Sequence, residues 1–138
     1  MKFDINDEKI GYALLRVMLG MNLMMHGVSR IKLGPGEFAG TLVIQFANTG
    51  LPHWLLVSFG VLLPGVEALL GFLLVTGLRT RAALVGAGTL MIALTFGSSL
   101  IQNWSAAATQ LTYGAIISAL LFLRRFNGWS VDSWMGRD

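Results

Sequence analysis

Three ionisable residues lie inside apolar stretches of this sequence, where an unpaired charge is costly. Arg16 and His26 lie in the apolar run that follows Lys9, and Glu67 lies in the run that follows His53. A charged side chain in the middle of a membrane span costs roughly 2.5–3.5 kcal/mol, so such residues normally face the interior of a helix bundle. We therefore take Glu67, His26 and Arg16 as the candidate catalytic residues.

Glu67 and Arg16 are predicted to form a buried pair. Counted at about 1.5 Å per residue along ideal helices, the two residues lie at similar depth within the bundle. Two interpretations of this pair stay open. It either joins the first two helices without a further role, or it belongs to a site that binds or protonates a polar molecule. Two interpretations also stay open for His26, which is either a structural residue or a functional group of such a site.

A second set of polar residues maps to one depth near the outer end of the same bundle. Asn22 and His26 are four residues apart and therefore share a helix face. Amide and phenol side chains at such a depth are suited to holding a polar cofactor. The candidate cofactor-binding residues are Asn22, Gln102, Asn103, Gln110 and Tyr113.

Metal and haem are not expected from the residue types present. The chain has no cysteine and only two histidines, His26 and His53. Zinc normally takes three or four side-chain ligands, and no clustered carboxylates are available to complete such a set. No phosphate-binding loop or catalytic triad motif occurs either.

Composition restricts the class of protein further. Hydrophobic residues make up 54% and charged residues 12% of the chain, and the mean hydropathy is +0.67. A soluble domain carries about 25% charged residues, so this composition excludes a typical cytosolic enzyme or nucleic-acid-binding protein. The net charge of +3 is interpreted as a signature of membrane topology, and no nucleic-acid partner is expected.

Four apolar segments are predicted to cross the lipid bilayer as helices, because a span needs about 20 apolar residues. Their approximate ranges are 10–28, 54–78, 82–102 and 106–123. The chain is therefore predicted to be all-α, with residues 1–138 forming one integral membrane four-helix bundle. Small residues at offsets of four and seven in the third segment predict close packing there. These are Ala82, Gly86, Ala93 and Gly97.

Two segments are predicted to lie outside the spans. The outer loop, 29–53, contains apolar and polar residues at helical spacing, which indicates a short amphipathic helix or an ordinary ordered loop. The residues concerned are Phe38, Leu42, Gln45 and Phe46. In the interfacial tail, 124–138, Ser130 is placed to cap a short helix that carries Trp129 and Trp134.

The distribution of basic residues predicts the orientation. With four spans, one side of the membrane carries Lys2, Lys9, Arg79, Arg81, Arg124, Arg125 and Arg137. The other side carries only Arg30 and Lys32. Because cytoplasmic loops are enriched in lysine and arginine, both termini are predicted to be cytoplasmic. The expected location is the prokaryotic cytoplasmic membrane, in multi-pass form.

The order of several short motifs resembles the DoxX family of small four-helix membrane proteins. The motifs are Arg16-x-x-x-Gly20, His26-Gly27 with Lys32, Gly50-Leu51-Pro52, Glu67-x-x-x-Gly71, Arg79-x-Arg81 and the closing Gly128-Trp129-Ser130-Val131-Asp132. The family is related to the membrane subunit of thiosulfate:quinone oxidoreductase. The resemblance implies a quinone-binding or redox-associated subunit of a membrane oxidoreductase system.

Under this resemblance, membrane quinone is the expected cofactor. His26, Arg16 and Tyr113 would donate hydrogen bonds to its carbonyls, and Glu67 would relay protons. The chain has no electron carrier of its own, so any enzymatic activity needs a membrane-protein partner, and whether it is an enzyme stays open. Two alternatives also stay open: a non-enzymatic scaffold or assembly subunit of a larger complex, and a small-molecule binder or transporter. A homo-oligomer is compatible with each of them.

Overall fold

The computed structural model describes residues 5–136, and every regular element in this part of the chain is a helix, which confirms the predicted all-α fold. The elements are α1 (Ile5–Leu33), α2 (Pro35–Gln45), α3 (His53–Thr76), α4 (Thr80–Leu100), α5 (Trp104–Phe122), η1 (Arg124–Phe126) and α6 (Val131–Trp134).

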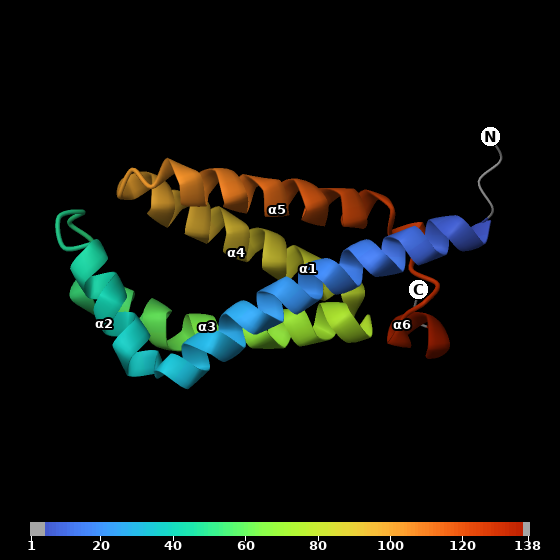
Figure 1. The fold of residues 1–138 in the computed structure, drawn as a ribbon, viewed down its shortest axis with the longest axis horizontal. Coiled ribbons are helices and arrows are strands. Elements are labelled where there is room, and N and C mark those ends of the chain that lie inside the picture. The colour runs from blue at the N-terminus through green and yellow to red at the C-terminus, as the bar shows by residue number, and fades with distance from the viewer. Residues whose placement is uncertain (1–4, 137–138) are drawn as a thin grey trace.

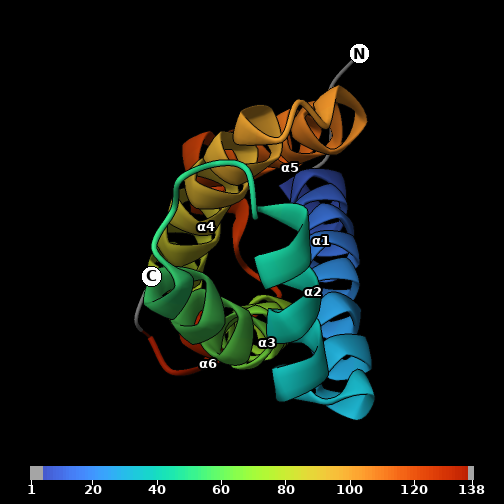
Figure 2. The same ribbon diagram turned by 90° about the vertical axis from the view of Figure 1, so that its left-hand side faces the viewer.

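The long helices form two pairs that diverge toward one end of the molecule. α1 packs chiefly against α3, and α4 packs chiefly against α5. Figure 1 shows α2 at one end of the bundle and α6 at the other, and the view along the bundle in Figure 2 shows α1, α3, α4 and α5 around a common centre. The core at this centre includes Leu74, Leu84 and Leu120, which are fully buried.

Three helices, α3, α4 and α5, are long and apolar enough to cross a membrane. Their outward side chains suit lipid, since Leu62, Ile92 and Leu111 are each more than 60% exposed. The chain is therefore a multi-pass membrane protein. α1 is not among the three, because polar side chains interrupt its apolar sequence, so the fourth span and the side of the membrane that each end faces stay predictions.

The first helix is longer than the sequence predicted. A range of about 10–28 was expected, but α1 continues to Leu33 and ends where Gly34 takes a φ of 108° ahead of Pro35. The predicted outer loop is correspondingly shorter and contains α2, which is the helical alternative for this segment. Gly27 lies inside this helix, and its lack of a side chain serves helix packing.

The closest helix contact is between α1 and α3, and glycine makes it possible. A Cβ atom on Gly27 would lie 2.4 Å from the backbone nitrogen of Ala68, and one on Gly71 would lie 2.3 Å from the backbone nitrogen of Met24. Of the small residues predicted to pack in α4, Gly86 and Gly97 lie against side chains from other parts of the chain, but Ala82 and Ala93 are exposed. The α1–α3 contact fixes the register that places the polar residues of both helices.

The C-terminal segment, residues 124–136, folds back against the end of the bundle that lies opposite α2. As predicted, Ser130 caps a short helix, since its hydroxyl accepts a hydrogen bond from the backbone of Ser133 at 3.1 Å. The side chain of Asp132 in α6 accepts hydrogen bonds from the backbone nitrogens of Arg79 and Thr80, both at 2.7 Å. Asp132 therefore joins the tail to the first turn of α4.

Candidate functional site

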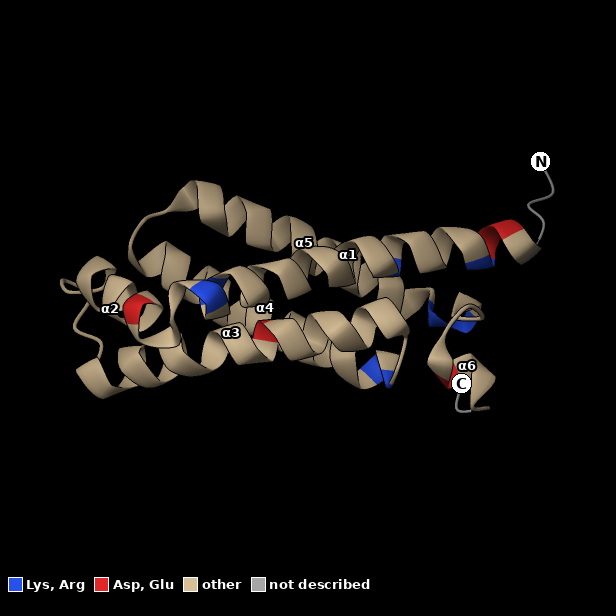
Figure 3. Ribbon diagram, turned by 60° about the horizontal axis from the view of Figure 1, so that its bottom comes forward, with Lys and Arg blue, Asp and Glu red and all other residues tan. Residues whose placement is uncertain are grey.

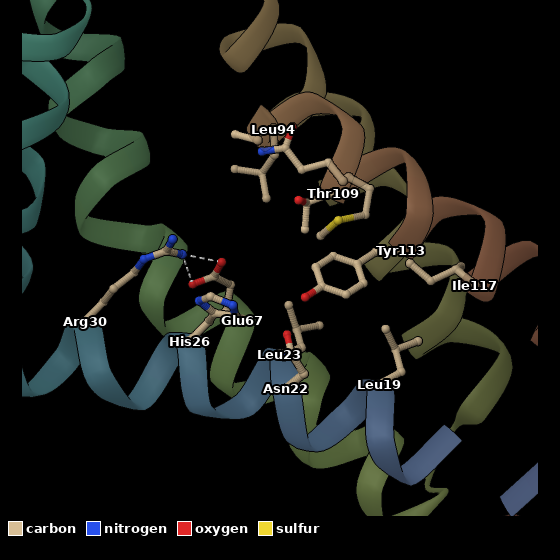
Figure 4. A pocket seen from close by; sticks show the side chains of 13 residues that line it. Leu19, Asn22, Leu23, His26, Arg30, Glu67, Leu94, Thr109, Tyr113 and Ile117 are labelled. Atoms are coloured by element: carbon tan, nitrogen blue, oxygen red, sulfur yellow. Dashed lines mark hydrogen bonds and ion pairs between the residues drawn. The ribbon is translucent and has the colours of Figure 1, made fainter. Parts of the chain in front are cut away.

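A cavity of about 200 Å³ lies between α1 and α5, and residues of α3 and α4 complete its walls. Its walls combine apolar and polar side chains. The residues that line it include Leu19, Asn22, His26, Arg30, Glu67, Gln110, Tyr113 and Ile117. Figure 4 shows Asn22, His26 and Arg30 along α1, with Tyr113 facing them from α5. The apolar end is formed by Leu19 and Ile117.

Glu67 and Arg30 form an ion pair at the polar end of this cavity. One guanidinium nitrogen of Arg30 donates to both carboxylate oxygens of Glu67, and the Glu67 side chain is 3% exposed against 27% for Arg30. Arg30 also stacks on the ring of Phe38 from α2, 4.7 Å from the ring centre. A buried carboxylate needs such a partner, and the pair carries no net charge.

The predicted pairing of Arg16 with Glu67 is wrong. Arg16 lies beside Gly77 at the far end of α3, about ten residues or 15 Å along the helix from Glu67. There its guanidinium donates to the side chain of Asn127 at 2.5 Å and to the carbonyl of Trp129 at 2.8 Å. The error arises from the predicted end of the first helix. Because this helix was assumed to end at Val28, its estimated midpoint was wrong, and so was the estimated depth of Arg16 relative to Glu67.

Arg30 is the site residue that sequence reasoning missed. It was assigned to the outer loop because the first helix was ended two residues before it. The signal that identifies it is spacing, since Asn22, His26 and Arg30 follow one another at intervals of four and therefore lie on one helix face. This face of α1 forms one wall of the cavity.

Several polar groups around the cavity have no hydrogen-bond partner among residues 5–136. The side chains of Asn22, His26 and Tyr113 are of this kind. Gln110 donates from Nε2 to the hydroxyl of Ser98 at 2.9 Å, but its Oε1 atom is buried without a partner. Because buried polar groups are normally hydrogen-bonded, the unpartnered Oε1 atom of Gln110 favours a bound polar molecule, and the exposed side chains of Asn22 and His26 are accessible to it.

The structure brings five of the eight predicted site residues to this cavity, namely Asn22, His26, Glu67, Gln110 and Tyr113. Arg16 lies elsewhere, as described above. Gln102 and Asn103 form the turn between α4 and α5 and do not line the cavity: Gln102 has a φ of 55°, and the side chain of Asn103 caps α5 by accepting from Ala106 at 3.1 Å. Both residues were predicted to share the depth of the other polar site residues, but this depth is only that of the turn between α4 and α5.

The donor set of the described residues gives no metal site. No group of three or more His, Cys, Asp or Glu side chains within residues 5–136 could hold a metal ion. His26 lies near Glu67 in Figure 4, but the carboxylate is already paired with Arg30. His53 begins α3 and does not line the cavity. The side chains of His26, Gln110 and Tyr113 can donate and accept hydrogen bonds in this cavity.

Comparison with known proteins corrects the family. The family model of the methylamine utilisation protein MauE matches residues 8–111, which include His26, Arg30, Glu67 and Gln110. No curated protein and no solved structure matches the chain. The predicted relation to DoxX is wrong, since MauE is a different membrane family. The motifs behind that prediction are short, and in this structure they mark helix contacts and a basic turn. Since the match covers most of its length, the chain belongs to the MauE family.

Proposed function

We propose that this protein is an accessory membrane subunit of a redox system and that it binds a quinone headgroup in the cavity between α1 and α5. The redox system for which its family is named is that of methylamine utilisation. The observation that carries this proposal is the set of unpartnered hydrogen-bonding groups on facing walls. Asn22 and His26 lie on α1, and Gln110 and Tyr113 lie on α5.

A quinone suits this arrangement in three respects. Its two carbonyls lie at opposite sides of one ring, so groups on opposite walls can bind both of them. The phenol of Tyr113 and the imidazole of His26 are the donors for these carbonyls. A quinone also has an apolar tail, for which Leu19 and Ile117 provide an apolar wall toward the lipid.

The charge balance of the cavity favours a neutral ligand over the methylammonium ion. Glu67 is the carboxylate of the cavity lining, and Arg30 neutralises it. A cation entering this site would have to displace or share the Arg30 guanidinium, which costs the energy of a buried ion pair. The pair instead provides a fixed dipole and a carboxylate within the polar end of the cavity.

An accessory role follows from what the residues can and cannot do. Hydrogen bonds bind and orient a quinone, but electron transfer requires a redox-active group, and the side chains of this chain provide no such centre. Electrons would therefore be exchanged with a partner subunit that carries one. The part assigned to this chain is to bind the quinone at a defined depth in the membrane.

A binding titration tests the proposal. A short-tailed quinone is added to the purified protein in neutral detergent, and binding is followed by the melting temperature and by tryptophan fluorescence. We expect saturable binding, and Tyr113→Phe should weaken it about tenfold, because one hydrogen bond contributes about 1–1.5 kcal/mol. Thr112→Val, at an exposed position of the same helix, serves as the matched control and should bind normally.

Two results would overturn the proposal. If the wild-type protein shows neither a thermal shift nor a fluorescence change with quinone, the cavity is not a quinone site. If methylammonium chloride stabilises the wild-type protein while quinone does not, the ligand is the amine and the argument from charge balance fails.

A further inference from the structure

A groove at the α6 end of the bundle gathers arginines from two separate segments. Its lining comprises Arg79, Arg81, Ala82, Val85, Gly86, Arg124 and Asp132, and we call it the arginine groove. Figure 3 shows blue ribbon at the turn between α3 and α4 and again after α5, near the red segment of α6. Arginines from the start of α4 and from η1 therefore face one open space of about 980 Å³.

The positive charge of the arginine groove is not balanced within the described residues. Asp132 is its one carboxylate, and both of its oxygens already accept hydrogen bonds from the backbone of Arg79 and Thr80. The guanidinium groups of Arg79, Arg81 and Arg124 have no ion pair or hydrogen-bond partner within residues 5–136. By contrast, the Arg125 side chain stacks on the ring of Phe126. Fifteen guanidinium donors thus remain for an external anion, at about five per arginine.

The backbone of Arg79 supports a role for its side chain beyond folding. Arg79 has a φ of 49°, in the left-handed region that glycine and asparagine occupy most easily. An arginine at this position is unfavourable for the turn, in contrast to Gly77, which has a φ of 69° two residues earlier. The strain at Arg79 is consistent with an arginine that serves binding.

The other wall of the arginine groove is apolar and belongs to a membrane-capable helix. Ala82, Val85 and Gly86 lie on the first two turns of α4, and Val85 is 51% exposed. The groove therefore changes from cationic to apolar along the direction in which α4 enters the membrane. A ligand that matches both parts has an anionic head and a hydrocarbon chain.

We propose that the arginine groove binds the phosphate of an anionic phospholipid, with the first part of an acyl chain against Ala82 and Val85. Arginine is suited to this because its planar guanidinium donates two parallel hydrogen bonds to phosphate oxygens. The site is independent of the cavity between α1 and α5, which lies toward the other end of the bundle and contains none of these residues.

Native mass spectrometry of the purified protein tests this proposal. The protein in neutral detergent is mixed with equal amounts of phosphatidylglycerol and phosphatidylcholine, and the lipids that stay bound are counted. The wild-type protein should retain phosphatidylglycerol preferentially. Arg81→Gln and Arg124→Gln should each reduce this preference about fivefold, since each basic residue near the membrane surface contributes an attraction of that size. The double variant should lose it.

Two further variants separate a specific site from surface charge and from misfolding. Arg125→Gln removes the same charge from the same segment but lies outside the arginine groove, so it should retain the preference. Arg79→Gly should reduce the preference while its melting temperature equals or exceeds that of the wild type, because glycine relieves the strained φ.

Three results would overturn the proposal. The first is a wild-type protein that retains both lipids equally. The second is an equal loss of preference in Arg125→Gln, which would indicate unspecific surface attraction. The third is displacement of phosphatidylglycerol by free glycerol phosphate at the same concentration, which would indicate a site for a soluble phosphate.

Discussion

At the α6 end of the bundle, Arg16 donates hydrogen bonds to the side chain of Asn127 and to the carbonyl of Trp129, and Asn127 in turn donates to the hydroxyl of Thr80 at 3.1 Å. In the cavity between α1 and α5, the side chains of His26 and Tyr113 have no such partner among residues 5–136. Both regions place polar groups in an apolar molecule. We call the first, comprising Arg16, Thr80, Asn127 and Asp132, the tail cluster.

The difference between the two regions indicates what each contributes. Paired polar groups within the chain hold segments together, and the tail cluster connects α1, α4 and α6. Unpartnered polar groups lower the stability of the protein when nothing binds to them, so their presence in the cavity favours a ligand. Arg16 is the one lysine or arginine within the predicted span 10–28, and it was therefore expected to belong to the site. Its hydrogen-bond partners place it in the tail cluster instead.

The largest effect is expected where one substitution separates the two helices that carry Arg30 and Glu67. A Cβ atom on Gly27 would lie 2.4 Å from the backbone of Ala68, so Gly27→Val forces α1 away from α3. We expect a loss of about 3 kcal/mol or more in the free energy of unfolding. Quinone binding should also be lost, since α1 carries Arg30 and α3 carries Glu67.

Thermal unfolding and quinone titration in detergent check this expectation. Gly65→Val is the matched control, because a Cβ atom on Gly65 of α3 meets no atom within 4 Å. A Gly27→Val protein as stable as the Gly65→Val protein would contradict the close α1–α3 contact.

Arg16→Met should disturb the tail cluster alone. The substitution removes the guanidinium that binds Asn127 and the Trp129 carbonyl, and leaves the buried side chain of Asn127 without that donor. We expect a loss of about 3 kcal/mol, because hydrogen bonds to charged groups contribute about 1.5–3 kcal/mol each.

The affinity for quinone, measured below the melting temperature, should not change in Arg16→Met. Arg125→Met is the control and should cost about 0.5 kcal/mol or less, since Arg125 is exposed. A large loss of quinone affinity in a folded Arg16→Met protein would return Arg16 to the site and remove the distinction between the two regions.

Arg30→Gln should convert the neutral cavity into an anionic one. Glu67 would stay 3% exposed without its cationic partner, while the glutamine retains one hydrogen bond to it. We expect a loss of about 2 kcal/mol in stability, smaller than for a fully buried pair because Arg30 is partly exposed. Methylammonium should then raise the melting temperature of the variant but not that of the wild type.

The same titration with tetramethylammonium, which cannot donate a hydrogen bond, separates a specific amine site from general attraction. Equal stabilisation of the wild type and Arg30→Gln by methylammonium would show that Arg30 does not neutralise the cavity.

Sequence patterns predicted the elements better than the contacts between them. Hydropathy identified the apolar helices, and the position of Ser130 predicted the cap of α6 correctly, because both are local properties of the chain. The partner of Glu67 depends on the register between α1 and α3, which Gly27 and Gly71 determine through contacts about 40 residues apart. Depth counting from estimated helix ends cannot resolve this register, so Arg30 was missed.

The family assignment was limited in a similar way. Asp132 supported a resemblance to DoxX, but the structure explains its position by the contact between α6 and the first turn of α4, where its side chain accepts from the backbone of Arg79 and Thr80. Short motifs of this type therefore indicate architecture more reliably than family.

The smallest expected effect has the opposite sign. Gln110 donates to Ser98, but its buried Oε1 atom has no partner, and exchanging the two amide atoms would leave Nε2 without one instead. Gln110→Leu removes this unpaired group, and the Ser98 hydroxyl can donate to a carbonyl of its own helix. We expect the free energy of unfolding to rise by about 1 kcal/mol.

Quinone affinity should fall about five- to tenfold in the same variant, because with the two amide atoms exchanged Nε2 donates to a quinone carbonyl, and leucine removes that hydrogen bond. Thr112→Leu adds a similar apolar side chain on the exposed face of α5 and is the control for stabilisation by composition alone. If Gln110→Leu is less stable than the wild type and binds quinone normally, Gln110 is a paired structural residue like those of the tail cluster. Gain of stability together with loss of binding would instead show that the chain retains an unfavourable amide because a ligand requires it.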